Sequence, residues 1–307
     1  MTLEKIISVV TCTFNRAYLL DNLYNSLKKQ TFKNFVWIVI DDGSTDNTEE
    51  LIERFIDQKI IDIVYKKIEN GGKHRALNKA IQMCQTKLFF IVDSDDQLVN
   101  NSLERIIKIE NGIKDKDNFC GLAGMRASFN GKLLSNTMKS DVIDATALES
   151  IYRYNLKGDK AEVFYSKVLK KYRFPEFSGE KFLNEAVLWN KIANDGYKIR
   201  WFNEVIYLGN YQNDGLTKHM LSLSIQNYRG RCYYHNEEIK YKIPLLKKIY
   251  HQSNYFRYGL CGKEKIKNLF EQASNKLLCI ITLPIGYMGM VYTKLILKNR
   301  YSKENLL

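Results

Sequence analysis

The sequence has few of the residues that break regular structure, with only three prolines and 17 glycines among 307 residues. Disordered and low-complexity chains are rich in such residues and poor in apolar ones, whereas 45% of this chain is hydrophobic. Disordered, collagen-like and low-complexity proteins are therefore excluded. The composition is that of a globular protein, and the length indicates one large domain or one domain with an extension.

The sequence also lacks the cysteine spacing of zinc sites and disulfide-rich secreted domains. Six cysteines are scattered along it: Cys12, Cys84, Cys120, Cys232, Cys261 and Cys279. None forms a C-x-x-C pair or stands at zinc spacing from a histidine, which indicates ordinary buried thiols in a reducing compartment. No signal peptide is recognisable, because Glu4 and Lys5 lead straight into an apolar run. We expect a cytoplasmic protein.

Acidic residues become scarce toward the C-terminus. Residues 218–307 hold 16 Lys and Arg against five Asp and Glu, a balance of +11, whereas residues 1–217 hold 31 against 29. A basic segment favours a phosphate-rich partner, which is an anionic membrane, a nucleic acid or a phosphorylated substrate. The two parts of the chain are therefore expected to do different jobs.

Residues 277–293 contain no charged side chain. This length is at the lower limit for a spanning helix, and Pro284, Gly286 and Gly289 weaken the span further. Four basic residues flank the run: Lys276, Lys294, Lys298 and Arg300. We expect the segment to lie in the membrane interface, and the alternatives are a buried hairpin and a true span.

The first 100 residues alternate apolar runs with helical patterns. Strands are expected at residues 6–11, 35–40, 60–65 and 88–92, and helices at 17–29, after a capping box at 46–49, and at 76–84. Strands and helices that alternate in this way form a parallel sheet, and ligands bind beyond the carboxyl ends of its strands.

The later part of the chain is less regular. Residues 119–175 are expected to mix strands and loops. The remaining expectations are a helix over 180–195, strands over 198–202 and 205–211, a turn at 213–215, and mostly helix to about residue 275.

Asp93-Ser94-Asp95 directly follows the fourth expected strand. Two carboxylates separated by one residue can hold Mg²⁺ or Mn²⁺ against a diphosphate, and the metal would neutralise charge on a departing phosphate. The alternative is a solvated helix start that Asp96 or Asn100 caps.

Three further sets of polar residues stand at the same expected edge of the sheet. They are Thr13, Phe14, Asn15 and Arg16 after the first strand, Asp41 and Asp42 after the second, and Lys73, His74 and Arg75 before a helix. The first set could hold a flat base, or it is a loop with a core Phe. The second could accept a hydrogen bond from a base or ribose, or it is a plain turn before a helix cap. The third could bind a diphosphate at a helix N-terminus, or it is a solvated basic turn.

The order and spacing of these motifs resemble the family 2 glycosyltransferases over residues 5 to about 100 and, more loosely, over 175–217. The resemblance implies a GT-A fold, an α/β Rossmann-like, mostly parallel sheet flanked by helices. This catalytic domain would occupy residues 1–217, with a nucleotide-binding half at 1–100 and an acceptor half at 101–217. A mainly helical extension, 218–307, would follow. One departure is Cys12, where the family commonly has proline.

The resemblance also implies an activity, the transfer of sugar from a nucleoside diphosphate sugar, usually with inversion and with Mn²⁺ or Mg²⁺. Thr13 and Phe14 would lie beside the nucleobase, Asp42 would read a base that is typically uracil, Asp93 would approach the ribose and Asp95 would ligate the metal. The rest of the implied donor site is Asn15, Arg16, Asp41, Lys73, His74, Arg75 and Ser94.

The family places a general base on a later helix, often within an acidic pair. The corresponding positions hold Asn184 and Glu185, so Glu185 is the expected base. On a helix over 180–195 it would share a face with Phe182 and Trp189. Glu180 is the fallback. Residues 213–217 either close over the acceptor or form a plain hairpin turn.

The expected partners are a nucleotide-sugar donor, a glycan or polyprenyl-linked acceptor, and an anionic membrane, with the protein peripheral at its inner face. Nucleic acid is not expected, since no recognition helix, RNP-like motif or zinc site is present. A nucleotidyltransferase also joins such a sheet to a D-x-D metal site, but its Gly-rich phosphate loop is missing at residues 12–16. The last alternative is a catalytically inactive scaffold, against which the intact acidic positions argue.

Overall fold

The structure is a computed structural model that describes residues 5–210 and 220–304, with side chains up to Lys298. The chain forms two compact units. The first comprises Met1–Phe174 and Lys191–Tyr211, and the second comprises Pro175–Asn190 and Gln212–Leu307. The turn expected at residues 213–217 lies outside the described residues.

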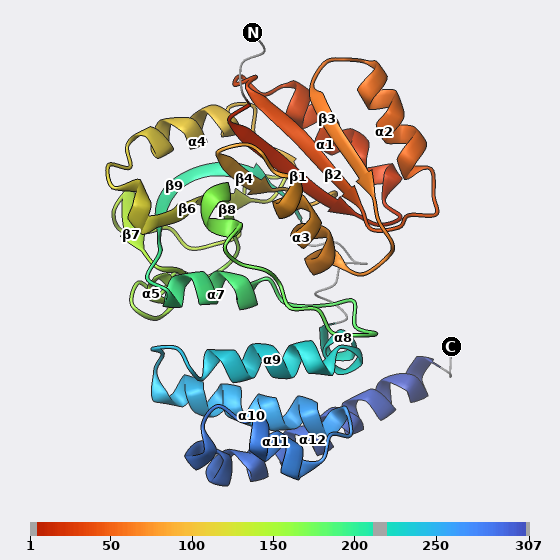
Figure 1. Cartoon of the computed structure of the whole chain (residues 1–307), viewed down its shortest axis with the longest axis vertical. Helices are drawn as coiled ribbons and strands as arrows, with labels where there is room; N and C mark the ends of the chain where they lie inside the picture. The colour runs from red at the N-terminus through yellow and green to blue at the C-terminus, as the bar shows by residue number, and fades with distance from the viewer. Residues whose placement is uncertain (1–4, 211–219, 305–307) are drawn as a thin grey trace. The chain divides into compact units, whose positions relative to one another are not determined.

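The first unit is built on one sheet, whose described strands run in the order β3-β2-β1-β4-β8-β6-β9-β5, with β7 paired to β9 (Figure 1). The strands are β1 (Ile7–Thr13), β2 (Phe35–Asp41), β3 (Asp62–Lys67), β4 (Leu88–Ile91), β5 (Gln97–Leu98), β6 (Phe119–Ala127), β7 (Val142–Ala145), β8 (Lys160–Tyr165) and β9 (Lys198–Leu208). The part from β3 to β4 is parallel. Beyond it, β8 is antiparallel to β4 and β6, and β6 is parallel to β9.

The four parallel strands expected from the apolar runs are confirmed within two residues at their starts. Val9, Trp37 and Phe89 have no exposed surface, as expected of strands that helices cover on both faces. The two strands expected over 198–211 are instead one strand, β9. Pairing with β6 and β7 on its two sides supplies hydrogen-bond partners along its length and keeps it continuous.

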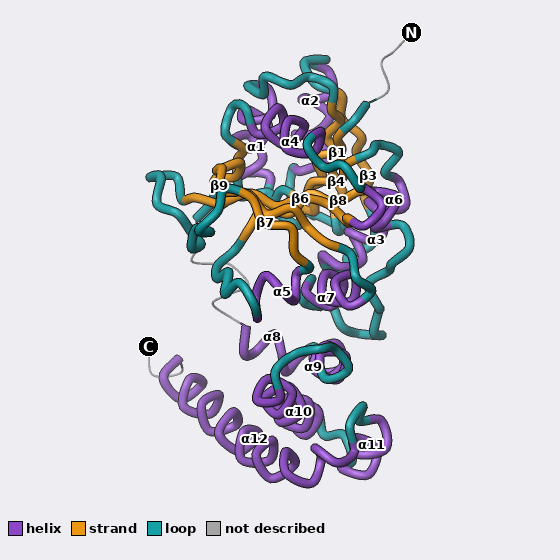
Figure 2. The backbone as a smooth tube through the Cα atoms, turned by 90° about the vertical axis from the view of Figure 1, so that its left-hand side faces the viewer, coloured by secondary structure: helices purple, strands orange, loops and turns teal. Residues whose placement is uncertain are grey.

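Helices cover the sheet, and Figure 2 shows α1, α2 and α4 together on one side of it. Those of the first unit are α1 (Ala17–Lys28), α2 (Thr48–Asp57), α3 (Lys73–Met83), α4 (Ser102–Asn111), the 3₁₀ turn η1 (Lys116–Asn118), α5 (Ala147–Tyr152) and α6 (Ser166–Leu169). Helix α7 (Ala186–Asn194) runs from the second unit into the first.

Two details of the expected helix starts are wrong. Helix α2 begins at Thr48, and the Asp46 carboxylate accepts hydrogen bonds from the N–H and hydroxyl of Thr48 (3.2 and 2.6 Å). The other half of the expected capping box is wrong, because the Glu49 carboxylate pairs with Lys67. Neither Asp96 nor Asn100 caps α4, whose N-cap residue is Asn101 and makes no side-chain cap bond.

The helix expected over residues 180–195 begins only at Ala186. The Asn184 side chain accepts a hydrogen bond from the N–H of Ala186 (2.9 Å), which ends the preceding irregular segment. Upstream, the N–H groups of Lys181 and Phe182 donate to Asn227 Oδ1 (2.7 and 2.9 Å) instead of entering a helix. The interpretation that Phe182 and Glu185 share a helical face is therefore wrong.

The second unit is mainly helical, as expected for the C-terminal region. Its further helices are α8 (Met220–Gln226), α9 (Tyr228–Glu238), α10 (Leu245–Cys261), α11 (Ile266–Gln272) and α12 (Lys276–Glu304). Helix α10 lies against both α9 and α12 (Figure 1). A Cβ atom at Gly286 would lie 2.5 Å from Phe256 Cβ, so glycine permits the close approach of α12 to α10.

The uncharged run 277–293 is part of the single helix α12, so a buried hairpin is excluded. Within the described residues, Lys276–Lys298 is the one helix whose length and composition would allow it to cross a membrane, and only 22% of its most apolar window is buried.

Candidate functional site

The strand ends that carry the polar motifs meet at one edge of the sheet. Thr13 and Asp41 pair at the ends of β1 and β2, and the N–H of Asp42 donates to the Thr13 carbonyl (2.8 Å). The loop after β4 begins beside them, because β4 pairs with β1. The parallel register therefore gathers residues that are far apart in the sequence.

The acidic loop after β4 is held by two cations. Lys73 Nζ lies 2.6 Å from Asp93 Oδ1, and Arg16 Nη1 lies 3.2 Å from Asp95 Oδ2. Burial alone would raise the pKa of Asp93, but Lys73, Arg126 and Arg16 together hold that pKa below its usual range. Asp93 is thus ionised and paired with a cation at neutral pH.

Behind this loop lies a polar network that the sequence analysis missed. Arg126 Nη2 donates to Asp96 Oδ2 (2.8 Å), and the Tyr207 hydroxyl donates to the same oxygen (2.7 Å). The Arg126 guanidinium also lies over the Tyr207 ring, 4.1 Å from its centroid. Burial raises the pKa of Asp96 to about 7 although Arg126 opposes this. The Tyr207 hydroxyl accepts a hydrogen bond from the Asp93 N–H (2.9 Å).

One signal in the sequence could have revealed this network. Arg126 is the only charged residue in the strand Phe119–Ala127, whose other members are apolar or glycine. A charge on a buried strand needs a partner of opposite charge, and the acidic cluster after β4 is a natural candidate. Tyr207 carries no comparable signal, because a tyrosine in an apolar strand is common.

Asp42 fastens the loop before α3. It is 5% exposed, and its carboxylate accepts hydrogen bonds from the N–H groups of Gly71 and Gly72 (both 2.8 Å) and from Asn70 Nδ2 (3.1 Å). Gly72 has φ 95°, which favours glycine. Asp42 therefore ties the end of β2 to the residues that start α3.

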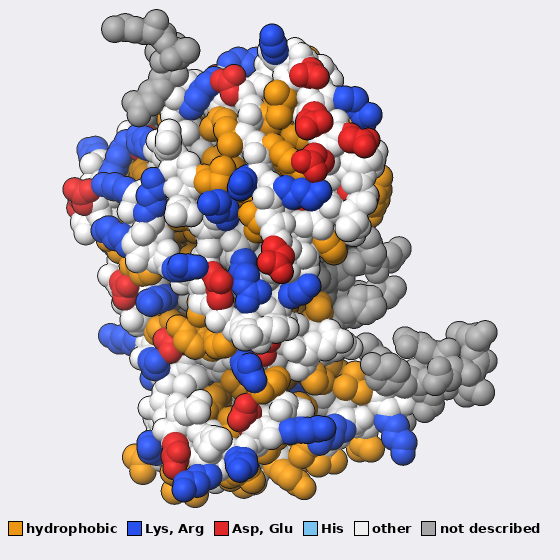
Figure 3. Space-filling model, turned by 45° about the vertical axis from the view of Figure 1, so that its right-hand side comes forward, with side chains coloured by type: hydrophobic (Ala, Val, Ile, Leu, Met, Phe, Trp, Pro, Cys, Tyr) orange, Lys and Arg blue, Asp and Glu red, His pale blue; other side chains and the backbone are white. Residues whose placement is uncertain are grey.

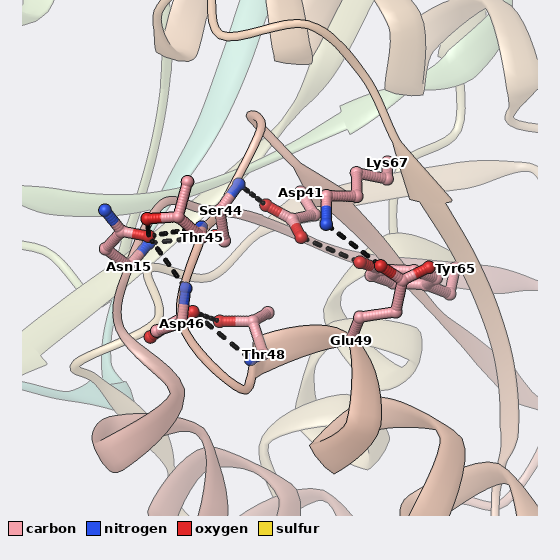
Figure 4. Close-up of polar contacts among 9 residues, drawn as sticks. All are labelled: Asn15, Asp41, Ser44, Thr45, Asp46, Thr48, Glu49, Tyr65 and Lys67. Atoms are coloured by element: carbon pink, nitrogen blue, oxygen red, sulfur yellow. Dashed lines mark hydrogen bonds and ion pairs between the residues drawn. The ribbon is translucent and has the colours of Figure 1, made fainter.

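Asp41 and Asn15 hold neighbouring parts of this edge, as Figure 4 shows. Asp41 has no exposed surface, and its two oxygens accept from the Ser44 N–H and the Tyr65 hydroxyl (both 2.7 Å). Asn15 Oδ1 accepts from the Thr45 N–H (2.7 Å), while its own N–H donates to Ser44 Oγ (2.9 Å). These contacts shape the loops around the strand ends.

Thr13 and Phe14, unlike Asp41 and Asn15, present groups that the described residues do not engage in hydrogen bonds. Thr13 is 3% exposed, and none of the described residues forms a hydrogen bond with its hydroxyl. Phe14 is 45% exposed. A polar group that lacks a protein partner beside an exposed aromatic ring suits a planar, polar ligand.

The three basic residues at the start of α3 differ in what they contact. Lys73 reaches the acidic loop, as described above. Arg75 Nη1 donates to the Gly71 carbonyl (2.6 Å) and so faces the loop before the helix. His74 is 2% exposed. Ser94, between the two acidic residues, is 3% exposed.

Whether a divalent metal fits this edge can be judged from the oxygen donors. No group of three His, Cys, Asp or Glu side chains with metal-binding geometry occurs among the residues that the structure describes. Mg²⁺ and Mn²⁺ are, however, commonly held by one or two carboxylates with substrate phosphates completing the shell. Asp95 and Asp93 are such carboxylates, and each already faces a cation. The residues present fit a metal that arrives with a diphosphate.

The expected base belongs to the second unit. Glu185 directly precedes α7, and its carbonyl accepts from the Leu188 N–H (3.0 Å). The fallback, Glu180, is 5% exposed and accepts hydrogen bonds from the N–H groups of Arg229 and Gly230 (both 2.8 Å). Its carboxylate therefore satisfies the first turn of α9, which is a structural role.

Comparison with known proteins gives this geometry a context. Residues 8–128 match the family model described as Glycosyl transferase family 2. A curated relative, GalNAc(5)-diNAcBac-PP-undecaprenol beta-1,3-glucosyltransferase of Campylobacter jejuni, is 29% identical over 197 residues, which are 60% of this chain and 58% of the relative. The chain thus spans little more than half of that protein.

Two solved structures share the fold. Staphylococcus aureus TarS 1–349 in complex with UDP-GlcNAc has a TM-score of 0.60 at 17% identity, over 97% of this chain and 92% of that one. The mannosyltransferase PcManGT from Pyrobaculum calidifontis, in complex with GDP-Man and Mn²⁺, has a TM-score of 0.59 at 16% identity, over 95% and 89%. The expected GT-A fold with a helical C-terminal region is confirmed.

Proposed function

Residues 8–128 belong to the family 2 glycosyltransferases, and from this premise we propose that the chain transfers a sugar from a UDP-sugar to a hydroxyl of a glycan or polyprenyl-linked acceptor in bacterial cell-surface polysaccharide synthesis. The observation that carries the proposal is the pairing of Asp93 with Lys73 and of Asp95 with Arg16 at the carboxyl edge of the sheet. Two carboxylates and two cations in one place can bind a metal together with a diphosphate.

The proposed reaction is a direct displacement with inversion. Glu185 takes the proton of the acceptor hydroxyl, the hydroxyl oxygen forms a bond to the anomeric carbon, and the bond from that carbon to the diphosphate oxygen breaks. Lys73 and Arg16 are released from their carboxylates as the diphosphate binds, and they stabilise the negative charge that develops on it. The nucleoside diphosphate leaves with the bonding electrons.

The donor residues have separate parts in this proposal. Thr13 offers its hydroxyl and Phe14 its ring to the base. Asp42 holds the loop of Gly71 and Gly72 that precedes α3. Asp93 approaches the ribose. Asp95 would hold Mn²⁺ or Mg²⁺, which when bound supplies positive charge to the leaving diphosphate.

Support for a lipid-linked acceptor comes from the C-terminal helix as well as from the Campylobacter relative, whose name includes an undecaprenol-linked glycan. The face of α12 toward α10 carries small and polar residues, and Cys279, Thr282 and Thr293 have no exposed surface. The outward face carries exposed large apolar residues: Leu277, Ile280, Ile281, Ile285, Tyr287, Met288, Val291, Tyr292 and Leu295. This pattern is the reverse of a water-soluble helix.

We therefore place the outward face of α12 in the surface layer of an anionic membrane. Lys276, Lys294 and Lys298 flank it, and exposed Tyr287 and Tyr292 suit the boundary between headgroups and acyl chains. The protein would then be peripheral at the inner face of the membrane, where polyprenyl-linked acceptors are found.

A donor panel tests the catalytic proposal. Purified protein is mixed with UDP-, GDP- and dTDP-sugars in Mn²⁺, Mg²⁺ or EDTA, and thermal stability and nucleotide release are measured. We expect metal-dependent stabilisation by a UDP-sugar that Asp95→Ala abolishes. Glu53→Ala, which removes an exposed carboxylate on α2, is the matched control. An unchanged melting temperature with every nucleotide sugar would favour the inactive scaffold.

The membrane proposal has its own test. Ile280→Glu and Met288→Glu place charge on the outward face of α12, where the two side chains are 71% and 61% exposed. Each should reduce binding to phosphatidylglycerol vesicles by about tenfold or more, the effect of failing to bury one large apolar side chain. Ile151→Glu, on α5 of the first unit and 47% exposed, should not change binding.

A further inference from the structure

A hollow of about 300 Å³ lies between α10 and α12. Its polar lining consists of Ser253, Asn254 and Arg257 on α10, and its apolar lining includes Leu246, Tyr250 and Ile285. Gly286 and Gly289 of α12 also line it. A Cβ atom at Gly289 would lie 3.2 Å from Arg257 Cδ, so any side chain there would intrude on Arg257.

The polar part of the hollow is built but incomplete. Arg257 Nε donates to Thr293 Oγ1 (2.7 Å), which fixes the side chain, and its Nη1 makes a long contact of 3.5 Å with Asn254 Oδ1. The guanidinium also lies 5.2 Å from the centroid of the Tyr258 ring. Ser253 is 8% exposed, and its hydroxyl has no hydrogen-bond partner among the described residues. A buried hydroxyl that forms no hydrogen bond destabilises the folded protein. An anion bound beside Arg257 would accept a hydrogen bond from the Ser253 hydroxyl.

The apolar part of the hollow is open to the surroundings. Leu246 is 79% exposed, Tyr250 54% and Ile285 43%. They continue the outward apolar face of α12, and Figure 3 shows hydrophobic side chains gathered among Lys and Arg over the part of the chain that contains α10 and α12. A ligand of this hollow therefore has one anionic group and a hydrocarbon portion.

We propose that this groove binds one anionic glycerophospholipid of the membrane surface, with its phosphodiester between Arg257 and Ser253 and an acyl chain along Leu246, Tyr250 and Ile285. The charge selects this ligand. Among the residues that the structure describes, Arg257 is the one charged residue in the lining, and no acidic residue lines the hollow with it. The site therefore matches the single charge of a phosphodiester better than the larger charge of a diphosphate.

This inference rests on the membrane contact proposed above, but not on glycosyl transfer. General attraction of lysines to an anionic surface has no defined stoichiometry, whereas the groove binds a single lipid at fixed atoms. The inference thus makes the second unit a specific lipid receptor and not only an apolar surface.

The test uses the full chain and dihexanoylphosphatidylglycerol below its critical micelle concentration, titrated by calorimetry. We expect saturable binding of one lipid per chain. Arg257→Gln should weaken it about tenfold or more, as expected for loss of charge-assisted hydrogen bonds, and Ser253→Ala severalfold. Arg257→Lys, which keeps the charge, should retain part of the affinity. Lys267→Gln, at an exposed position on α11, is the matched control and should bind like the unaltered chain.

Thermal unfolding verifies that each variant is folded, and Ser253→Ala keeps the test valid if Arg257 variants do not fold. Dihexanoylglycerol and inorganic phosphate each supply half of the ligand and should bind at least tenfold more weakly. Absence of saturable binding, equal affinity for inorganic phosphate, or tighter binding of geranyl diphosphate would each overturn the proposal. The donor panel is read separately, so loss of lipid binding with intact UDP-sugar binding would overturn this inference alone.

Discussion

The Tyr207 hydroxyl accepts a hydrogen bond from the backbone N–H of Asp93 at 2.9 Å. Strand β9 thereby holds the first residue of the acidic loop, although 114 positions separate the two residues in the sequence. The same hydroxyl donates to Asp96, which Arg126 also contacts. The loop that would bind the donor is thus positioned by strands from the later half of the first unit.

We expect Tyr207→Phe to impair donor binding without unfolding the protein. The change removes two hydrogen bonds and retains the ring. The Asp93 N–H loses its acceptor, and the Asp96 carboxylate loses one of its donors. We expect a decrease of about tenfold in affinity for the UDP-sugar, equivalent to the loss of one or two hydrogen bonds. Calorimetric titration measures it. A tenfold loss of kcat at unchanged donor affinity would contradict a positioning role.

Arg126→Met should produce a larger effect, because it leaves Asp96 buried without its cation. We expect a lower melting temperature and at least a tenfold loss of donor affinity. Arg126→Lys keeps the charge but not the forked donor, so it should recover part of both. If donor affinity fell while Arg126→Met kept its melting temperature, the structural cost assigned to buried Asp96 would be wrong.

Asp41→Ala distinguishes the role of Asp41 from that of neighbouring Asp42 at the end of β2. Asp41 accepts from Ser44 and Tyr65 within the protein, so its loss should decrease the free energy of unfolding by about 2–4 kcal/mol. Because Asp41 bonds within the protein, the donor affinity of the folded protein should fall less than it does in Asp95→Ala. Urea unfolding measures the first effect and titration the second, and Tyr65→Phe, which removes one of the two bonds, should cost about half as much.

Glu185→Gln and Glu180→Gln should fail in different ways. If Glu185 is the base, its amide variant binds the UDP-sugar normally and loses transfer by about a hundredfold or more. Glu180→Gln weakens the two hydrogen bonds at the start of α9, so it should lower the melting temperature. Normal transfer by Glu185→Gln at saturating acceptor would show that another group takes the proton.

Glu238 should make the stability of the protein dependent on pH. Burial raises the pKa of Glu238 from 4.5 to about 7, although Asn190 donates to its carboxylate. Above pH 7 the carboxylate is ionised in both folded and unfolded chains. As the pH falls from 7 toward 4.5, the folded chain binds a proton that the unfolded chain has not yet bound, so folding becomes more favourable.

Glu238→Gln removes this dependence because an amide mimics the protonated acid. The variant should be more stable than the natural chain at pH 8, by up to about 3 kcal/mol, and similar to it near pH 5. Urea unfolding at pH 8 and at pH 5 measures the difference in the free energy of unfolding between the two proteins. Neighbouring His251, whose Nε2 lies 4.0 Å from Glu238 Oε2, has a pKa that burial lowers to about 4, so it is neutral in the folded chain at pH 8 and largely neutral at pH 5. A variant less stable at pH 8 would contradict the buried charge.

The sequence predicted the parts of the fold whose signals are local. β-branched and aromatic runs such as Phe35–Asp41 form strands wherever a covering layer buries them. The spacing of the acidic and basic motifs placed Asp93 and Asp95 at the edge of a parallel sheet. The predicted start of the helix over 180–195 was wrong because Asn227, which is distant in the sequence, accepts hydrogen bonds from the N–H groups of Lys181 and Phe182.

What the sequence by itself determined is therefore the α/β alternation, the glycosyltransferase motifs and the basic, helical C-terminal region, since each depends on residue types and short spacings. Only the tertiary structure decided that Arg126 and Tyr207 support the acidic loop, that Glu180 caps α9, and that α12 turns its apolar face outward. Hydrogen bonds and burial between distant segments depend on which surfaces pack together, and periodicity along one segment does not record its neighbours.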